Sequence, residues 1–501
     1  MIKNIIYIFS FLYFTTLTAQ DSFRFHLVSD PAFLNPASIS TSQANYFFSN
    51  VFSGLYKYDN AKGLIGTGAK HCKFKGSKIL ECVLNQNVKY HDGSRILAQD
   101  YVRAFQHLIN PKNYARRVDL LFNLKNAKAI YAGEKKPEEL GISAKSDKRL
   151  LFEFDEIDKD FLYKLSSPVL TPWKSLPSKP NWETTQFNGP YFIKKWIMGR
   201  KIILEANPHF MPSKKRIKNI EIIFIEEDST ALRLFEAGKL DFLRRIPASE
   251  IPFYKKKNSF LQVPMARFDY VGLTGELDKY PKLREAMTMA LNYEEFKKLF
   301  HALGRAGCPA IPSTYMNQTH CYKFDLERAK ALLKKVDPKV LKQRFVMNFS
   351  SAGGDDIRRA AEWFQYQWKK NLGLNIEARP MEQKVFIAQL RKNPPSIFRK
   401  GIPLDRPSCL AAMENFTSDA PENFIRLKNS SYDLAVKKLK ETSGIKNSKR
   451  QCSNSLKALL ATHKYIPLGR MYFTMLDNRK FKNVKLNELN QLDLTEIQLN
   501  Q

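Results

Sequence analysis

Strand-like and helix-like segments alternate along most of this 501-residue chain. In residues 217–243, alternating apolar residues indicate a strand, the next apolar residues recur at helical spacing, and Gly238 stands where a helix would end. A strand, a long helix ended by Gly373 and a second strand follow in residues 344–381, and helical spacing also predicts a helix over residues 283–300. Such alternation predicts helices packed on sheets, an α/β fold. The length predicts two or three domains.

The first residues have the layout of a secretory signal peptide. Lys3 supplies an early positive charge, an apolar run follows from Ile5 to about Leu17, and Ala19 is a small residue at which a peptidase could cut. An uncleaved membrane anchor is the alternative interpretation. No cysteine precedes residues 20–21, so the lipid-attachment pattern is absent, and no later stretch reaches the ~20 apolar residues that span a bilayer. We therefore expect residues 1–19 to be removed and the mature protein to be soluble, periplasmic and monomeric.

The net charge of +32, from 81 Lys and Arg against 49 Asp and Glu, predicts attraction to anionic partners. Export argues against nucleic acid as that partner. Two basic runs, residues 194–201 and 213–218, are interpreted either as solvated surface or as contacts with an anionic membrane surface or acidic ligands.

The chain has six cysteines, an even number that agrees with export, and none of them forms a CxxC pair that would indicate zinc. Two of them stand symmetrically about a Gly-Ser turn, and two more bracket a proline-containing loop. Six buried thiols are the alternative to disulfides. The pairing that we expect is Cys72–Cys82 across a hairpin, Cys308–Cys321 around the loop and, by elimination, Cys409–Cys452.

His91 and Asp92 stand side by side just ahead of an amphipathic helix that the apolar spacing predicts over residues 98–109. An acid–base pair or a metal site would be one interpretation. The eight histidines show no HxxxH or HxH spacing, and the chain has no GxSxG, HExxH or nucleotide-binding glycine motif. We therefore interpret the turn as architecture and expect a protein that is not an enzyme, with no catalytic residue, no metal and no cofactor.

Seven blocks of the sequence, which follow one another along the chain in the family's order, resemble the large solute-binding proteins that deliver oligopeptides or dipeptides to ABC importers. These proteins are known as solute-binding protein family 5. The most recognisable is the turn and helix just described, "VKYHDGSRILAQDYVRAFQHLINP". The others are "SDPAFLNP…FSNVFSGLYKYD", "NGPYFIKKW", "LREAMTMALNYEEF", "AEWFQYQWKKNLGLNIE", "NSSYDLAVKKL" and "IPLGRMYF".

The resemblance implies a two-lobed periplasmic binding protein fold of the large type, with an extra N-terminal subdomain and a hinge of two strands. A peptide would lie between the lobes and pair with strand edges, so that its backbone supplies most of the affinity. The expected division is 20–50 and 169–265 for the first lobe, 51–168 for the extra subdomain, 266–467 for the second lobe and 468–501 for a return to the first lobe.

The same resemblance implies the ligand contacts. In the first lobe, "SISTSQ" fits the family's ligand-contacting segment, and in the second lobe "FRKGIPLDRP" fits a pattern R-x-G-x-x-x-D whose aspartate takes the peptide's α-ammonium group. The expected residues are Ser40, Thr41 and Ser42 for backbone contacts, Gly401 and Pro403 on the ligand edge, Asp405 as the ammonium anchor and Arg399 for a ligand carboxylate.

The chain departs from the family pattern at several of these positions. Leu97 stands where a threonine usually caps the helix, and Ser53 replaces the usual acid before a glycine. Arg406-Pro407 follows the aspartate at once, and Pro403 removes a backbone donor. Asp405 could therefore be a loop carboxylate paired with Arg399 or Arg406, and the cargo could be a solute other than a peptide.

We expect an extracytoplasmic binding protein that captures oligopeptides and docks on the membrane permease of an ABC importer. An exported binder outside transport, such as a sensor, a chaperone-like peptide holder or a basic surface-adhering protein, is the alternative.

Overall fold

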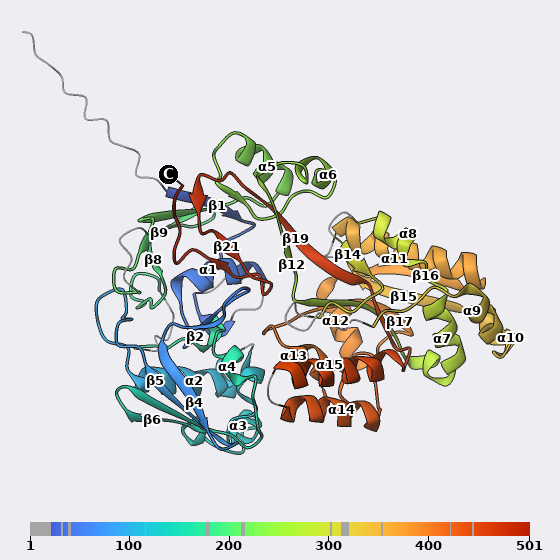
Figure 1. The fold of residues 1–501 in the computed structure, drawn as a ribbon, viewed down its shortest axis with the longest axis horizontal. Coiled ribbons are helices and arrows are strands. Elements are labelled where there is room, and N and C mark those ends of the chain that lie inside the picture. Colours follow the sequence, from blue (N-terminus) through green and yellow to red (C-terminus); the bar gives the residue numbers. More distant parts are fainter. Residues whose placement is uncertain are drawn as a thin grey trace, which may run out of the picture.

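The computed structural model describes residues 22–31, 34–38, 42–115, 117–175, 181–211, 216–300, 303–311, 320–351, 354–420, 422–442 and 445–500. The described chain forms two bodies that lie side by side, and strands β12 and β19 run from one to the other (Figure 1). Helices cover sheets in both bodies, which confirms the predicted α/β, two-lobed architecture.

The main sheet of the first body draws its strands from distant parts of the chain. Its centre is β1, whose alternating Phe23 and Phe25 are buried and whose neighbours β10 and β11 both run parallel to it. The strand order is β12 (Phe260–Pro264), β19 (Gly469–Asp477), β11 (Phe242–Leu243), β1 (Ser22–Leu27), β10 (Asn219–Phe224), β9 (Lys201–Ala206) and β8 (Tyr191–Ile197). Helices α1 (Ser42–Val51), α5 (Asp228–Glu236) and α6 (Ile251–Tyr254) belong to the same body.

A smaller antiparallel sheet lies at the end of the first body away from α5 (Figure 1). Its order is β4 (Ala69–Lys75), β5 (Ile79–Leu84), β7 (Arg149–Glu153) and β6 (Ile142–Ser146). The amphipathic helix α2 (Ala98–Ile109) packs against β6 with Phe105 and other apolar side chains buried. The hairpin of β2 (Tyr56–Asp59) and β3 (Gly63–Gly66), and the short helices α3 (Ala127–Tyr131) and α4 (Phe161–Lys164), complete this region.

The second body is built on a mixed five-stranded sheet. The order is β16 (Asn375–Met381), β15 (Arg344–Ser350), β17 (Ile397–Pro403), β13 (Arg267–Leu273) and β18 (Tyr465–Pro467). Its helices are α7 (Pro281–Met289), α8 (Tyr293–Lys298), α9 (Leu326–Leu333), α10 (Pro338–Leu341), α11 (Gly354–Leu372), α12 (Gln383–Lys392), α13 (Cys409–Met413), α14 (Ser430–Glu441) and α15 (Ile445–Leu460). The prediction of one helix over residues 283–300 was wrong, because α7 ends at Met289 and Asn292 caps a new helix by accepting the N–H of Glu294.

Two strands carry the chain between the bodies. β12 leads into β13, and β18 leads back into β19, which pairs antiparallel with β12 over residues 260–264. The first residues of β19 pair instead with β14 (Leu303–Ala306) of the second body. β19 is therefore hydrogen-bonded to strands of both bodies. The two connections, β12 to β13 and β18 to β19, form the expected two-stranded hinge.

The His91-Asp92 turn is structural, as predicted. The His91 Nδ1 atom accepts the N–H of Phe187 at 3.1 Å, its ring stacks on Phe192, and burial lowers its pKa. Asp92 accepts two hydrogen bonds from Ser94 within the turn. In the described ranges no group of His, Cys, Asp and Glu is arranged to hold a metal ion.

No side chain caps the start of α2 at Leu97, but Asp100 in the first turn bonds back to the Leu97 backbone, as the third residue of a capping box does. Asp100 accepts the N–H of Leu97 at 3.0 Å, and its other partners are the Tyr90 hydroxyl and the Arg103 guanidinium. A carboxylate in the first turn also suits the positive end of the helix dipole.

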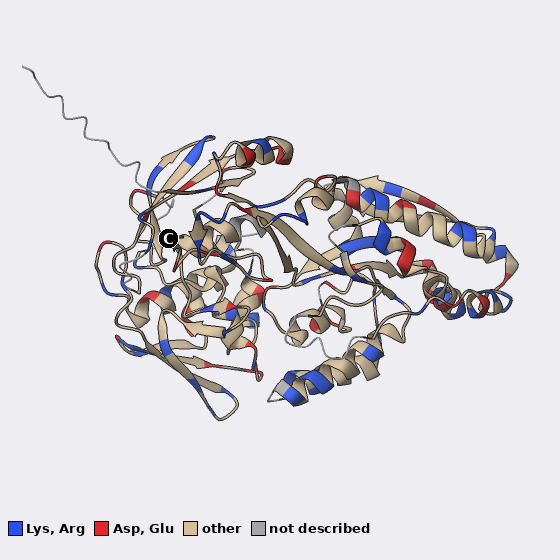
Figure 2. Ribbon diagram, turned by 45° about the horizontal axis from the view of Figure 1, so that its top comes forward, with Lys and Arg blue, Asp and Glu red and all other residues tan. Residues whose placement is uncertain are grey.

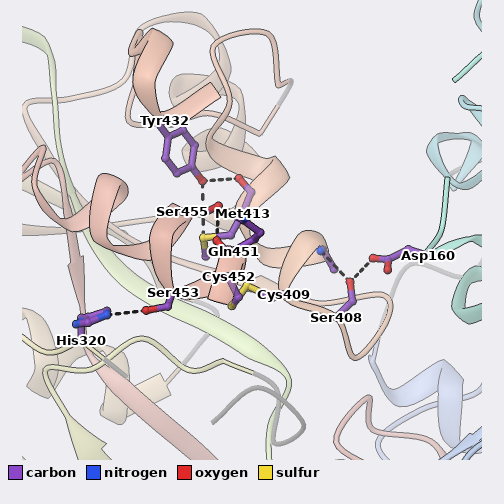
Figure 3. The surroundings of a disulfide bond; sticks show 11 residues. Asp160, His320, Ser408, Cys409, Met413, Tyr432, Gln451, Cys452, Ser453 and Ser455 are labelled. Carbon is purple, nitrogen blue, oxygen red and sulfur yellow. Dashed lines mark hydrogen bonds between the residues drawn. A yellow bond between two sulfur atoms is a disulfide. The ribbon is translucent and has the colours of Figure 1, made fainter. Parts of the chain in front are cut away.

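All three expected disulfides are present. Cys72 and Cys82 face each other across β4 and β5 in register, and Cys308 is bonded to Cys321. The third bond joins Cys409 at the start of α13 to Cys452 in α15 (Figure 3).

Candidate ligand-binding site between the two bodies

Strand β17 has a sheet partner on only one side along its last residues. β13 pairs with the whole strand, from Ile397 to Pro403, whereas the register with β15 ends at the pair Phe349–Arg399. Among the described residues, residues 400–403 therefore have no strand on the β15 side. An open edge of this kind can add an extended peptide as a further strand.

The register identifies which backbone groups face that open edge. Leu404 donates its N–H to the carbonyl of Ala266 at 2.9 Å, so every second residue of β17 bonds to β13. Gly401 falls between those residues, and its N–H and C=O therefore point away from β13. Pro403 has the same orientation but no N–H. Gly401 is thus the residue that could both donate to and accept from an added strand.

A cluster of cations lies beside this edge. A Cβ atom at Gly401 would collide with the Arg267 guanidinium, which places that guanidinium against the Gly401 backbone. Asp269 is buried between Arg267, at 2.9 Å, and Arg399, at 2.6 Å. Burial opposes ionisation of Asp269, but the two guanidinium groups outweigh it and lower its pKa. Arg399, expected to meet a ligand carboxylate, is itself buried and paired with Asp269, so that role stays a prediction.

Lys400 adds a third cation to the cluster. Its ammonium donates to the Gly401 carbonyl at 2.7 Å and lies over the Phe424 ring. Burial lowers the pKa of Lys400 to about 8. The cluster formed by Arg267, Arg399 and Lys400 contains one buried acid, Asp269, and Glu422 adds a negative charge near Lys400. The three cations still outnumber these two acids, which favours negative charge nearby.

Asp405 follows the strand and contacts two arginines. The Arg406 Nη1 atom lies 2.9 Å from Oδ1 and 3.1 Å from Oδ2, and Arg117 of the first body donates to Oδ2 at 2.8 Å. Burial opposes ionisation of Asp405, but the charges of Arg406 and Arg117 prevail and hold its pKa at about 2. The alternative in which Asp405 pairs with Arg406 is thus observed, and the role of Asp405 as ammonium anchor stays a prediction.

Further contacts join the two bodies around Asp405. Asp160 of the first body accepts from the Arg406 Nε atom at 3.0 Å and from the Ser408 hydroxyl. Figure 3 shows Ser408 at the start of α13, turned toward Asp160 on the opposite ribbon. At the edge of the interface, Lys440 of α14 pairs with Glu156 at 2.5 Å.

The ligand contacts expected in the first body stay predictions. Ser40 and Thr41 lie outside the described residues, and Ser42 begins α1 with a side chain that is also outside them. Sequence reasoning missed Arg117, Asp160 and Arg267. Arg117 lies 288 residues from Asp405, so no local spacing could have connected them.

Lys and Arg are spread over both bodies rather than gathered at the site (Figure 2). In the basic run 194–201, Lys194 pairs with Glu205 at 2.7 Å and Lys201 with Glu221 at 2.6 Å. Part of this charge is therefore neutralised within the strand layer. Most of the second basic run, 213–218, lies outside the described residues. None of the described helices is both long and apolar enough to cross a bilayer.

Comparisons with known proteins agree with this architecture. The family model for bacterial extracellular solute-binding proteins, family 5 (middle), matches residues 73–424. The oligopeptide-binding protein OppA of Bacillus subtilis (strain 168) is 26% identical over 413 residues, which are 76% of this chain and 75% of that protein. The probable deoxycholate-binding periplasmic protein YgiS of Escherichia coli (strain K12) is 24% identical over 451 residues, covering 84% and 83%.

The fold itself matches solved structures over nearly its whole length. The structure of the Escherichia coli murein tripeptide binding protein MppA superposes with a TM-score of 0.79 at 19% identity, covering 97% of this chain and 99% of that one. Each of these relatives is named as a binding protein.

Proposed function

Since the chain belongs to the bacterial extracellular solute-binding proteins of family 5, we propose that it captures short peptides between its two bodies for delivery to the permease of an ABC importer. The two bodies act as lobes, with residues 20–50, 169–265 and 468–501 in the first, 51–168 as its extra subdomain and 266–467 as the second. Residues 1–19 act as an export signal, so that the mature protein works in the periplasm.

The open edge at Gly401 is the observation that carries this proposal. Its outward N–H and C=O offer a donor and an acceptor in strand geometry. In the loop that follows, Asp405 is hydrogen-bonded to Arg117 of the other lobe. A peptide backbone is the ligand class that can pair with both groups without a demand on side chains, since the Gly401 carbonyl keeps a second lone pair beside its bond from Lys400. Closure of the lobes is then a hinge motion about β12 and β19 that the cargo's contacts with both lobes favour.

Binding of peptides tests this function directly. A mixed tetrapeptide library is incubated with protein purified without refolding, and the bound fraction is read by native mass spectrometry. We expect retained peptides with varied side chains and no new hydrolysis product. An N-methyl group on one backbone amide is expected to cost at least tenfold in affinity, because it removes a ladder donor. Retention of no peptide by correctly folded protein would reject the proposal.

A non-peptide solute is the second candidate, and one observation favours it. The relative YgiS is named as a probable deoxycholate-binding protein, which places a bile salt beside peptides among the cargo classes of similar chains. The anionic carboxylate of such a ligand would suit the cations near Gly401. Isothermal titration with deoxycholate, in parallel with the peptide library, distinguishes the two candidates.

A further inference from the structure

Arg117 contacts Asp405, the residue that the family resemblance predicts as the anchor of the cargo's α-ammonium group. Its Nη2 atom is 2.8 Å from Asp405 Oδ2, and the bond runs from the first lobe to the second. A carboxylate has about four acceptor positions, and Arg406 and Arg117 together place three donor contacts on Asp405. The acid therefore already has the charge-assisted bonds that an α-ammonium group would seek.

Arg117 is itself held firmly in this position. The Asp119 carboxylate accepts a hydrogen bond from the Arg117 Nε atom at 3.0 Å and another from Nη2 at 2.9 Å. Two parallel bonds of this kind fix the orientation of a guanidinium group. The Asp405 side chain is 14% exposed and that of Arg117 is 32% exposed, so water reaches the arginine more readily than the acid. Arg117 is therefore the more exposed of the two arginines on Asp405, since the Arg406 side chain is 2% exposed.

We propose that Arg117 is a specificity-determining residue that competes with the cargo's α-ammonium group for Asp405. This inference rests on the proposed capture of peptides and deepens it by naming the feature of the peptide that the site discriminates. A cargo with a free amino terminus has to displace Arg117 from Asp405, because the ammonium group would otherwise be a third cation beside Arg406 and Arg117 on one carboxylate, and like charges repel. A peptide with a blocked amino terminus avoids this displacement, so Arg117 shifts the preference toward such cargo.

The neighbouring acids do not remove this competition, because each is already paired with a cation of the protein. Asp160 accepts from Arg406, and Glu414 lies 2.5 Å from the same guanidinium. Asp158 is buried against Lys164 at 2.7 Å. Asp405 is accordingly the acid that both Arg117 and an entering ammonium group would use.

The test compares free and N-acetylated peptides on three variants and a matched control. An equimolar mixture of isotopically labelled free and N-acetylated tetrapeptide libraries is offered to each protein, and the ratio of free to acetylated peptide in the bound fraction is measured. Arg117→Met is expected to raise this ratio at least tenfold over the wild type. Asp405→Asn and the double variant Arg117→Met/Asp405→Asn are expected to have equally low ratios, because both lack the acid.

Lys440→Met is the control, because it removes another ion pair between the lobes without touching Asp405. Its ratio is expected to stay within twofold of the wild type. A ratio that Arg117→Met leaves unchanged, or that Lys440→Met raises equally, would overturn the inference while the bound peptides still support the proposed function. No bound peptide in any of these proteins would overturn the proposed function and the inference together.

Discussion

The guanidinium of Arg406 lies 3.0 Å from the carboxylate of Asp160, although 246 residues separate the two in the sequence. The remaining nitrogens of Arg406 contact Asp405 and Glu414, and the side chain is 2% exposed. A single buried cation therefore holds acids from both lobes just after the end of β17. Its burial makes the interface depend on charge pairing rather than on apolar packing alone.

We expect Arg406→Met to lower the free energy of unfolding by about 3–5 kcal/mol, because removing one partner of a buried pair leaves acids without a counter-charge. Urea denaturation at pH 7, followed by tryptophan fluorescence, measures this loss. Arg328→Met removes a more exposed pair with Glu285 and is expected to cost less than about 1 kcal/mol. Similar losses for the two variants would show that the Arg406 network is not stabilising.

The low pKa of Asp405 predicts a defined acid sensitivity. The folded-state pKa of about 2 lies below the ordinary value of 3.8, so ionised Asp405 contributes stability above pH 4 that is lost as the pH falls toward 2. The contribution is on the order of 2 kcal/mol. We expect the stability difference between wild type and Asp405→Asn to shrink over this range in urea titrations at pH 5, 4 and 3. The same difference for exposed Asn454→Ala, which removes no ionisable group, should not change, and an equal decline for both would contradict the assignment.

Much of the fold followed from local patterns, because apolar spacing and glycine positions are set within short segments. The helix over residues 98–109, the strand–helix–strand order of 344–381 and the hairpin around Cys72 and Cys82 are of this kind. The break between α7 and α8 was missed because apolar residues continue through it, although Asn292 is a typical capping residue.

The candidate site could be predicted only in part. The segment around Gly401 and Asp405 was singled out by its resemblance to the family pattern R-x-G-x-x-x-D, which lies within a short stretch, and its role stays a prediction. The partners of those residues come from elsewhere: Arg267 from the neighbouring strand, and Arg117 and Asp160 from the other lobe. Contacts of this kind are fixed by how the lobes pack, and one sequence carries no local trace of them.

The disulfide between Cys409 and Cys452 supports the segment that carries the interlobe contacts. It closes a separation of 43 residues and ties the start of α13, next to Ser408, to α15. We expect the double variant Cys409→Ala/Cys452→Ala to lose about 4 kcal/mol by the loop-entropy relation. Removing Cys72–Cys82, which closes 10 residues, should cost about 2.7 kcal/mol by the same relation.

Urea midpoints of the two double variants, measured beside the wild type, check the order of these losses. A smaller loss at Cys409–Cys452 than at Cys72–Cys82 would argue against the entropic account. In the peptide-retention assay, we expect the Cys409/Cys452 variant to release cargo faster, because the loop bearing Ser408 is less constrained.

The buried Lys400 predicts that the stability of the protein also changes at alkaline pH. Burial lowers its folded-state pKa to about 8 from 10.5, so between these values the unfolded chain binds more protons than the folded one. The free energy of unfolding attributable to Lys400 therefore rises as the pH increases from 8 to 10. We expect Lys400→Met, which never carries the buried charge, to be more stable than wild type at pH 7 by about 1–2 kcal/mol. This advantage should decline by pH 10 in urea titrations, whereas exposed Asn454→Ala, which removes no ionisable group, should show no such trend. A constant advantage of Lys400→Met would mean that the ammonium is not destabilised by burial.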